Sequence, residues 1–113
     1  MIAALIAAGC AGVEDGEGVI HARLTVASGD FTVTPSTDGW QASLCWPVRV
    51  TAAQMAQWTA RHPHAPMYIW QGESRIVMQV TPQDLAHWAA LAEEMVAHSV
   101  PWRRQQRVPG EGN

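Results

Sequence analysis

The 113-residue sequence contains no lysine, one tyrosine, one phenylalanine and two cysteines. Cys10 and Cys45 are too few for a disulfide framework or a cysteine-rich zinc site, so we expect two reduced thiols in a cytoplasmic protein. No apolar run reaches the ~18 residues that a membrane-spanning helix needs. The formal net charge of −3 gives no general attraction to nucleic acid or to an anionic membrane.

The length and the composition, which is 48% hydrophobic, predict one globular domain. We expect this single α+β domain to span residues 1–101 and to end at Pro101, because proline cannot continue a helix. The remaining residues, 102–113, carry three arginines and end in a glycine-rich segment. They are expected to form a basic, flexible C-terminal tail.

The first ten residues end in Ala-Ala-Gly-Cys, which looks like a bacterial lipoprotein cleavage site. The segment has no basic residue and is shorter than the ~15–30 residues of an ordinary signal peptide. We therefore expect a short buried helix that ends at Gly9, and keep a small exported lipoprotein, lipidated at Cys10, as an alternative. The acidic segment Glu14–Gly18 is predicted to be a solvated turn.

Alternation of apolar and polar residues predicts three antiparallel strands in the first half of the chain. They cover residues 19–26, 31–34 and 40–50, and turn-forming residues separate them. Pro47 has no N–H group, so the third strand is expected to be an edge strand or to break there in a bulge.

A phrase of eleven residues occurs twice, at 50–60 and again 30 residues later at 80–90. Each copy resembles the end of a strand, a threonine that caps a helix, and a helix that carries a tryptophan. The helices are expected at about 52–62 and from Thr81 onward. Between them, residues 67–71 and 75–80 predict a second hairpin. Because 67–70 is apolar on both faces, that strand is either central and covered twice or exposes an aromatic.

These elements predict a short N-terminal helix followed by the order β-β-β-α-β-β-α. The fold class is therefore α+β, with a mostly antiparallel five-stranded sheet and two main helices packed on one face. The other face is expected to be open to solvent, and arginines fall in phase on three of its strands. The candidate binding residues are those arginines, two aromatics and the start of the tail: Arg23, Arg49, Arg75, Tyr68, Trp70, Trp102, Arg103 and Arg104.

No catalytic constellation is present: the serines lack an elbow motif, no glycine pattern matches a phosphate loop, and the paired carboxylates diverge. The histidines His62, His64, His87 and His98 lack metal-binding spacing, and we predict neither a metal nor a cofactor. A sheet with arginine and aromatics also suits a single-stranded nucleic-acid binder. The excess of carboxylates over arginines in residues 1–100 disfavours that alternative.

The sequence thus predicts a small, non-enzymatic protein-binding module without membrane contact, for which nucleic acid is a less favoured partner. An adaptor, an immunity protein or a phage or mobile-element inhibitor of a host protein complex fits its size and charge. A homodimer through the Pro47 edge or the tryptophan-rich surface is compatible with each of these functions.

Overall fold

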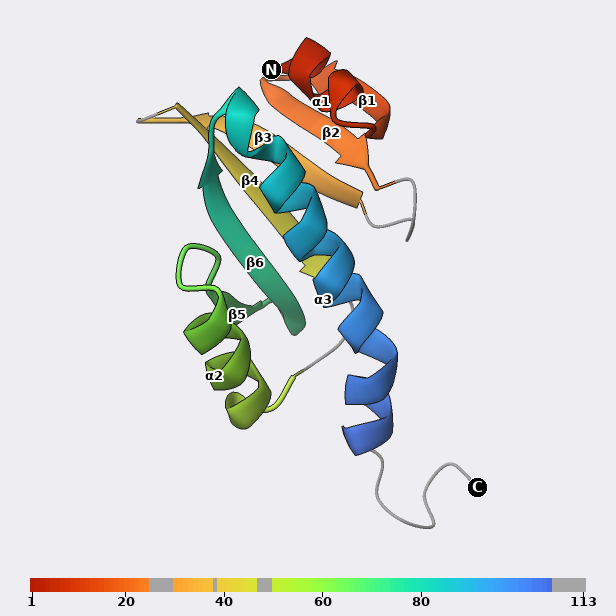
Figure 1. Cartoon of the computed structure of the whole chain (residues 1–113), viewed down its shortest axis with the longest axis vertical. Coiled ribbons are helices and arrows are strands. Elements are labelled where there is room, and N and C mark those ends of the chain that lie inside the picture. Colours follow the sequence, from red (N-terminus) through yellow and green to blue (C-terminus); the bar gives the residue numbers. More distant parts are fainter. Residues whose placement is uncertain (25–29, 38, 47–49, 107–113) are drawn as a thin grey trace.

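A computed structural model describes residues 1–24, 30–37, 39–46 and 50–106, the last nine of these as backbone only. In this part of the chain, an antiparallel sheet is flanked by three α-helices, which confirms the α+β class (Figure 1). The elements are α1 (Ile2–Ala7), β1 (Ala11–Gly16), β2 (Val19–Arg23), β3 (Asp30–Ser36), β4 (Gly39–Trp46), α2 (Ala52–Arg61), β5 (Met67–Trp70), β6 (Glu73–Val80), the 3₁₀ turn η1 (Pro82–Asp84) and α3 (Leu85–Gln106).

The sheet has six strands in the order β1-β2-β3-β4-β6-β5, so the expected number of five is wrong. The additional strand is β1, which occupies the acidic segment predicted as a turn. Only Glu17 and Gly18 form the turn, with φ of 56° and 82°. Positive φ at both central residues is the geometry of a tight two-residue hairpin, which lets the preceding acidic residues pair with β2. The segment lacks an apolar alternation because it is an edge strand with mostly exposed side chains.

β4 lies between β3 and β6, so the expectation of an edge strand at Pro47 is wrong. The described part of this strand runs from Gly39 to Trp46. Residues 47–49 lie outside the described part of the chain. β5 is an edge strand with exposed aromatic side chains, so of the two alternatives for 67–70, the exposed aromatic is correct.

The core lies between the sheet and the helices, on the face where the apolar residues of neighbouring strands share rows. One row joins Ile20, Val33 and Ala42, and another joins Leu44, Ile76 and Met67. α2 packs against β5, whereas α3 lies along β4 and β6 (Figure 1). Each of these two helices buries one tryptophan completely, Trp58 in α2 and Trp88 in α3.

The repeated phrase corresponds to two similarly built helix starts. Thr51 Oγ1 accepts a hydrogen bond from the Gln54 N–H at 3.1 Å, and the Gln54 side chain accepts one from the Thr51 N–H at 2.9 Å. At the second copy, the Asp84 carboxylate accepts from the Thr81 N–H at 2.8 Å. These reciprocal bonds satisfy backbone donors that the first helical turn leaves unpaired. Seven residues after each threonine, the helix carries its buried tryptophan.

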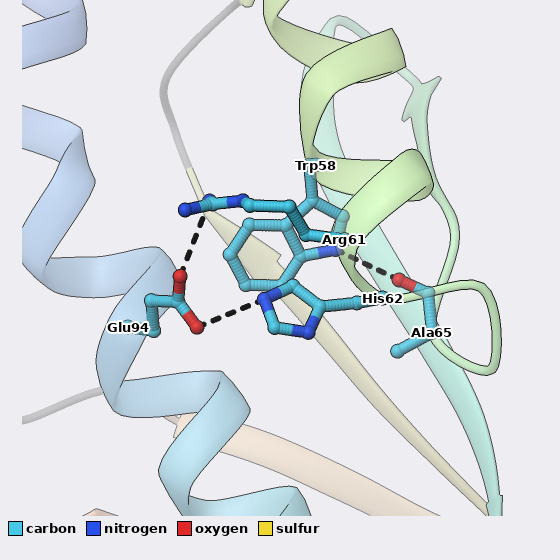
Figure 2. Close-up of polar contacts among 5 residues, drawn as sticks. All are labelled: Trp58, Arg61, His62, Ala65 and Glu94. Atoms are coloured by element: carbon cyan, nitrogen blue, oxygen red, sulfur yellow. Dashed lines mark hydrogen bonds and ion pairs between the residues drawn. The ribbon is translucent and has the colours of Figure 1, made fainter.

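An ionic cluster joins the end of α2 to α3 (Figure 2). The two oxygens of the Glu94 carboxylate lie 3.1 Å from Arg61 Nη2 and 2.9 Å from His62 Nε2. Arg61 and His62 also lie against the Trp58 ring, whose indole N–H donates to the Ala65 carbonyl at 2.8 Å. The cluster fixes the α2 end and the following loop with charge-assisted contacts as well as apolar packing.

α3 runs through Pro101 to Gln106, so the expected helix end at Pro101 is wrong. A proline inside a helix removes one backbone hydrogen bond, at a cost of ~3 kcal/mol, but the residues on either side keep helical geometry here. Residues 107–113 lie outside the described part of the chain. Among the described helices, none is both long and apolar enough to cross a bilayer.

Candidate interaction surface

The open face of the sheet carries the polar halves of the alternating strands, and its residues form rows across the strands. In the strand register, Arg23 lies directly opposite Asp30, Cys45 opposite Arg75, and Arg75 opposite Tyr68. The last β3–β4 pair is Thr32 with Ser43, so continuing the same register by two residues puts Asp30 beside Cys45. Both residues line one shallow depression. A single row therefore crosses five strands from Arg23 to Tyr68. Arg23 and Arg75 are three strand spacings apart, roughly 14 Å between backbones.

One end of this row is a cluster of aromatic and cationic side chains, which we call the Arg75 corner: Arg75, Tyr68, Trp70 and Ser43. The guanidinium carbon of Arg75 lies 4.8 Å from the centroid of the Trp70 ring and 5.9 Å from that of Tyr68. Arg75 Nε donates to Ser43 Oγ at 2.8 Å. Cation–π contact on two rings and a hydrogen bond hold the guanidinium in place, while the rings remain about 40% exposed (Tyr68 38%, Trp70 43%).

The other end of the row has a different electrostatic character. Arg23 lies opposite Asp30, and its guanidinium passes close to Gly12 of β1. Glu14 lies opposite His21 on the same face, and at the Arg75 end of the sheet Glu73 lies opposite Trp70. Among the described strands, carboxylates thus alternate with the two arginines of this face. The resulting surface has mixed charge and is not a cationic stripe.

Three of the eight predicted binding residues come together in the structure: Arg75, Tyr68 and Trp70. Arg23 shares their face but lies at the far end of the row. Arg49 lies outside the described part of the chain. The last three, Trp102, Arg103 and Arg104, belong to the last turns of α3, of which only the backbone is described.

Cys45 lies on the open face beside the Arg75 corner. Burial raises the pKa of its thiol, the nearby charge of Arg75 lowers it, and Glu73 raises it, with a net upward shift. At neutral pH the group is therefore a thiol and not an activated thiolate. The depression next to it measures about 160 Å³ and is lined by His21, Asp30, Phe31, Thr32, Ser43 and Cys45.

The histidines that the sequence offered do not gather into a metal site in the described residues. His62 contacts Glu94, whereas His64 and His87 line a depression of about 400 Å³ together with Asp84. No group of three or more His, Cys, Asp or Glu side chains in the described residues is arranged to hold a metal ion. The side chain of His98 is not described.

Sequence reasoning missed two residues that shape this surface. Ser43 accepts a hydrogen bond from Arg75. The alternation of residues 40–50 puts Ser43 on the open face, and this pattern could have indicated it. Thr59 of α2 accepts a hydrogen bond from the backbone N–H of Met67 at 3.2 Å, and no sequence pattern indicated this contact between helix and strand.

No protein-family model, curated protein or solved structure matches this chain.

Proposed function

We propose that this protein is a non-enzymatic protein-binding module that docks an acidic segment of a partner protein on the Arg75 corner. The observation that supports the proposal is the partly exposed Arg75 side chain, whose guanidinium lies near two exposed aromatic rings and is hydrogen-bonded to Ser43. Tryptophan, tyrosine and arginine are the residues that most often dominate binding energy at protein interfaces.

The corner is preorganised for recognition of a carboxylate. An unrestrained arginine side chain on a protein surface loses rotamer freedom when a partner binds it, at a cost of ~0.5–1.5 kcal/mol. The Ser43 bond and the two rings already restrict Arg75, so less entropy remains to be lost. A carboxylate can take a charge-assisted bond from the guanidinium while the rings bury apolar area around it.

Single-stranded nucleic acid is the competing ligand for an arginine flanked by aromatic rings. The carboxylates of Glu14, Asp30 and Glu73 on the same face oppose a phosphate backbone. An acidic peptide that contacts only the corner avoids most of them. The salt dependence of binding separates the two ligands, because each neutralised phosphate adds to the slope of affinity against salt.

The cellular role within this proposal is that of an adaptor, an immunity protein or an inhibitor of a host protein complex. A one-domain chain of 113 residues with a net charge of −3 has the size and charge suited to occupying another protein's surface. The proposal concerns a cytoplasmic protein that works without a cofactor.

Affinity capture from the native host, with and without nuclease, tests the proposal. We expect a protein companion that survives nuclease and is lost with Arg75→Glu, by about 30-fold or more for a hot spot of ~2 kcal/mol. Arg75→Lys retains the charge but loses the planar stack, and should weaken binding less. Gln57→Glu, on the exposed side of α2, is the control and should bind normally.

Two outcomes would overturn the proposal. In the first, Arg75→Glu folds normally by circular dichroism and retains its companion at wild-type affinity. In the second, the only companion is a nucleic acid that nuclease removes. The second outcome would instead identify the open face as a single-strand binding surface.

A further inference from the structure

The outer edge of β5 has backbone groups that no described residue satisfies. The Met67 N–H donates to Thr59 Oγ1, so it points away from β6 and takes no part in the ladder between the two strands. Hydrogen-bonded and non-hydrogen-bonded pairs alternate along an antiparallel ladder. Tyr68 and Trp70 therefore pair their backbone groups with β6, whereas those of Ile69 point outward. The turn agrees, because Gln71 and Gly72 both have positive φ and close the hairpin directly after Trp70.

The side chains of β5 are arranged symmetrically about Ile69. Tyr68 and Trp70 project on the open face and Ile69 on the other, with 38%, 43% and 37% of their surfaces exposed. The strand contains no charged residue and no proline. Two of the sequence features that prevent an edge strand from pairing with another chain are therefore absent from β5.

We propose that β5 pairs antiparallel with β5 of a second copy of this chain, about a two-fold axis at Ile69. In this arrangement each Ile69 N–H donates to the Ile69 carbonyl of the other copy, so the same patch satisfies itself on both sides. Tyr68 then lies opposite Trp70 of the second copy, and each of the three exposed side chains of β5 gains a cross-strand neighbour. The pairing would join the two sheets into one.

The order of side chains across the paired strands favours this occupant over an arbitrary strand. In each copy Arg75 shares a row with Tyr68, and Glu73 shares a row with Trp70. When Tyr68 of one copy lies opposite Trp70 of the other, the combined row runs Arg75, Tyr68, Trp70, Glu73. Opposite charges thus flank the two aromatics in both symmetry-related rows, and aromatic cross-strand pairs contribute favourably.

The inference goes beyond the proposed function and does not rest on it, because it uses the edge of the sheet, whereas the partner site lies on the open face. Pairing would bring two Arg75 corners together on one continuous face. Four residues on each side form an interface below the standard size, so we expect a weak dimer. Its detection requires protein concentrations from about 1 μM to about 1 mM.

Sedimentation equilibrium of the full chain over this range tests the inference. We expect the mean mass to rise from 12.3 kDa toward twice that value. Ile69→Pro removes the outward N–H but no bond to β6, and should remain monomeric throughout. Ile69→Val retains the N–H and the strand preference and should dimerise within about threefold of the wild type. Ile69→Lys places like charges across the axis and should also be monomeric.

Amide hydrogen exchange gives a second measurement that does not depend on the folding of a variant. In the wild type, the Ile69 amide should become more protected as concentration rises, while the amides of β1 do not change. A chain that stays monomeric at 1 mM overturns the inference. So does a dimer that persists in well-folded Ile69→Pro and Ile69→Lys, or one without added protection at Ile69.

Discussion

The two edges of the sheet, β1 and β5, show how differently one fold can terminate its strands. β1 has Glu14 and Asp15 within the strand and an irregular register between Ala11 and Glu14. β5 has four apolar residues in regular register, and a single side-chain hydrogen bond from α2 occupies its outer backbone. Charge and a bulge prevent edge pairing. β1 is therefore protected by its own sequence, whereas β5 depends on its neighbour and remains open at Ile69.

The helices next to the two edges differ in how much buried side chain each contributes. α1 has six residues and contributes one buried side chain, Leu5. α2 contributes Trp58, whose indole is fully buried and hydrogen-bonded to Ala65. The edge that is chemically open for pairing is thus the better anchored one. A firmly held edge can present its aromatic side chains without fraying, which suits recognition.

Truncation of the two anchors should produce the largest difference between the edges. Trp58→Ala leaves a large cavity and an unpaired Ala65 carbonyl, and should lower the free energy of unfolding by about 3–5 kcal/mol. Leu5→Ala should cost about 2–3 kcal/mol, because the short α1 can relax around the gap. Urea denaturation of both variants gives the comparison. An equal or larger loss for Leu5→Ala would show that α2 is not the stronger anchor.

Removal of charge from β1 should make the two edges more alike. Asp15→Val extends the apolar part of the outer strand and should raise self-association by about 2- to 30-fold, from two cross-strand pairs of ~0.2–1 kcal/mol each. Sedimentation at matched concentrations measures the change. Glu93→Gln on α3 removes the same charge elsewhere and should have no effect. If both variants associate equally, net charge and not edge chemistry keeps β1 unpaired.

The ionic cluster at the α2 end should make a smaller contribution. Glu94→Gln removes the anion that Arg61 and His62 share, and should cost about 0.5–1 kcal/mol, because Arg61 is half exposed and solvent screens the pair. The neighbouring Glu93→Gln is the matched control and should stay within experimental error of the wild type. A loss above about 2 kcal/mol would mean that the cluster carries part of the anchoring assigned to Trp58.

The smallest expected difference is in the alkylation rates of the two cysteines, Cys10 near β1 and Cys45 in β4. Burial raises the pKa of both thiols, so alkylation by iodoacetamide at pH 7 should be slower than for a free thiol and should rise with pH. Arg75→Glu removes a charge that lowers the pKa of Cys45, and should slow Cys45 further while Cys10 is unchanged. Mass spectrometry of timed samples separates the sites. A faster Cys45 in Arg75→Glu would contradict the geometry of the corner.

The sequence predicted the fold class, the two long helices, their threonine caps and the open face, because these features follow from local periodicity and capping. It missed β1, because an edge strand with exposed acidic residues has no apolar alternation to detect. The prediction that the strand before Pro47 is an edge strand was also wrong, because β4 lies between β3 and β6. The absence of an N–H indicates where a ladder stops, but it does not specify which strands lie on either side.

The candidate site was predictable only in part. Residues two apart on a strand share a face, which puts Tyr68 on the same side as Trp70, and the register of the β5–β6 hairpin then brings Arg75 beside them. Strand order could not be derived from periodicity, so the distance between Arg23 and Arg75 and the pairing of Arg23 with Asp30 appear only in the structure. The contact of Thr59 with Met67 depends on how α2 crosses β5, which is a tertiary property.

The strand order has a kinetic consequence. Each of the first three strands pairs with the strand that follows it in the chain, so the contacts of this meander are local and close quickly once the segment leaves the ribosome. β6 must instead enter between β4 and β5, after a connection that contains all of α2. We expect the pairing of β4 with β6 to limit the folding rate. Until it forms, one backbone edge of β4 in the nascent chain has no strand partner.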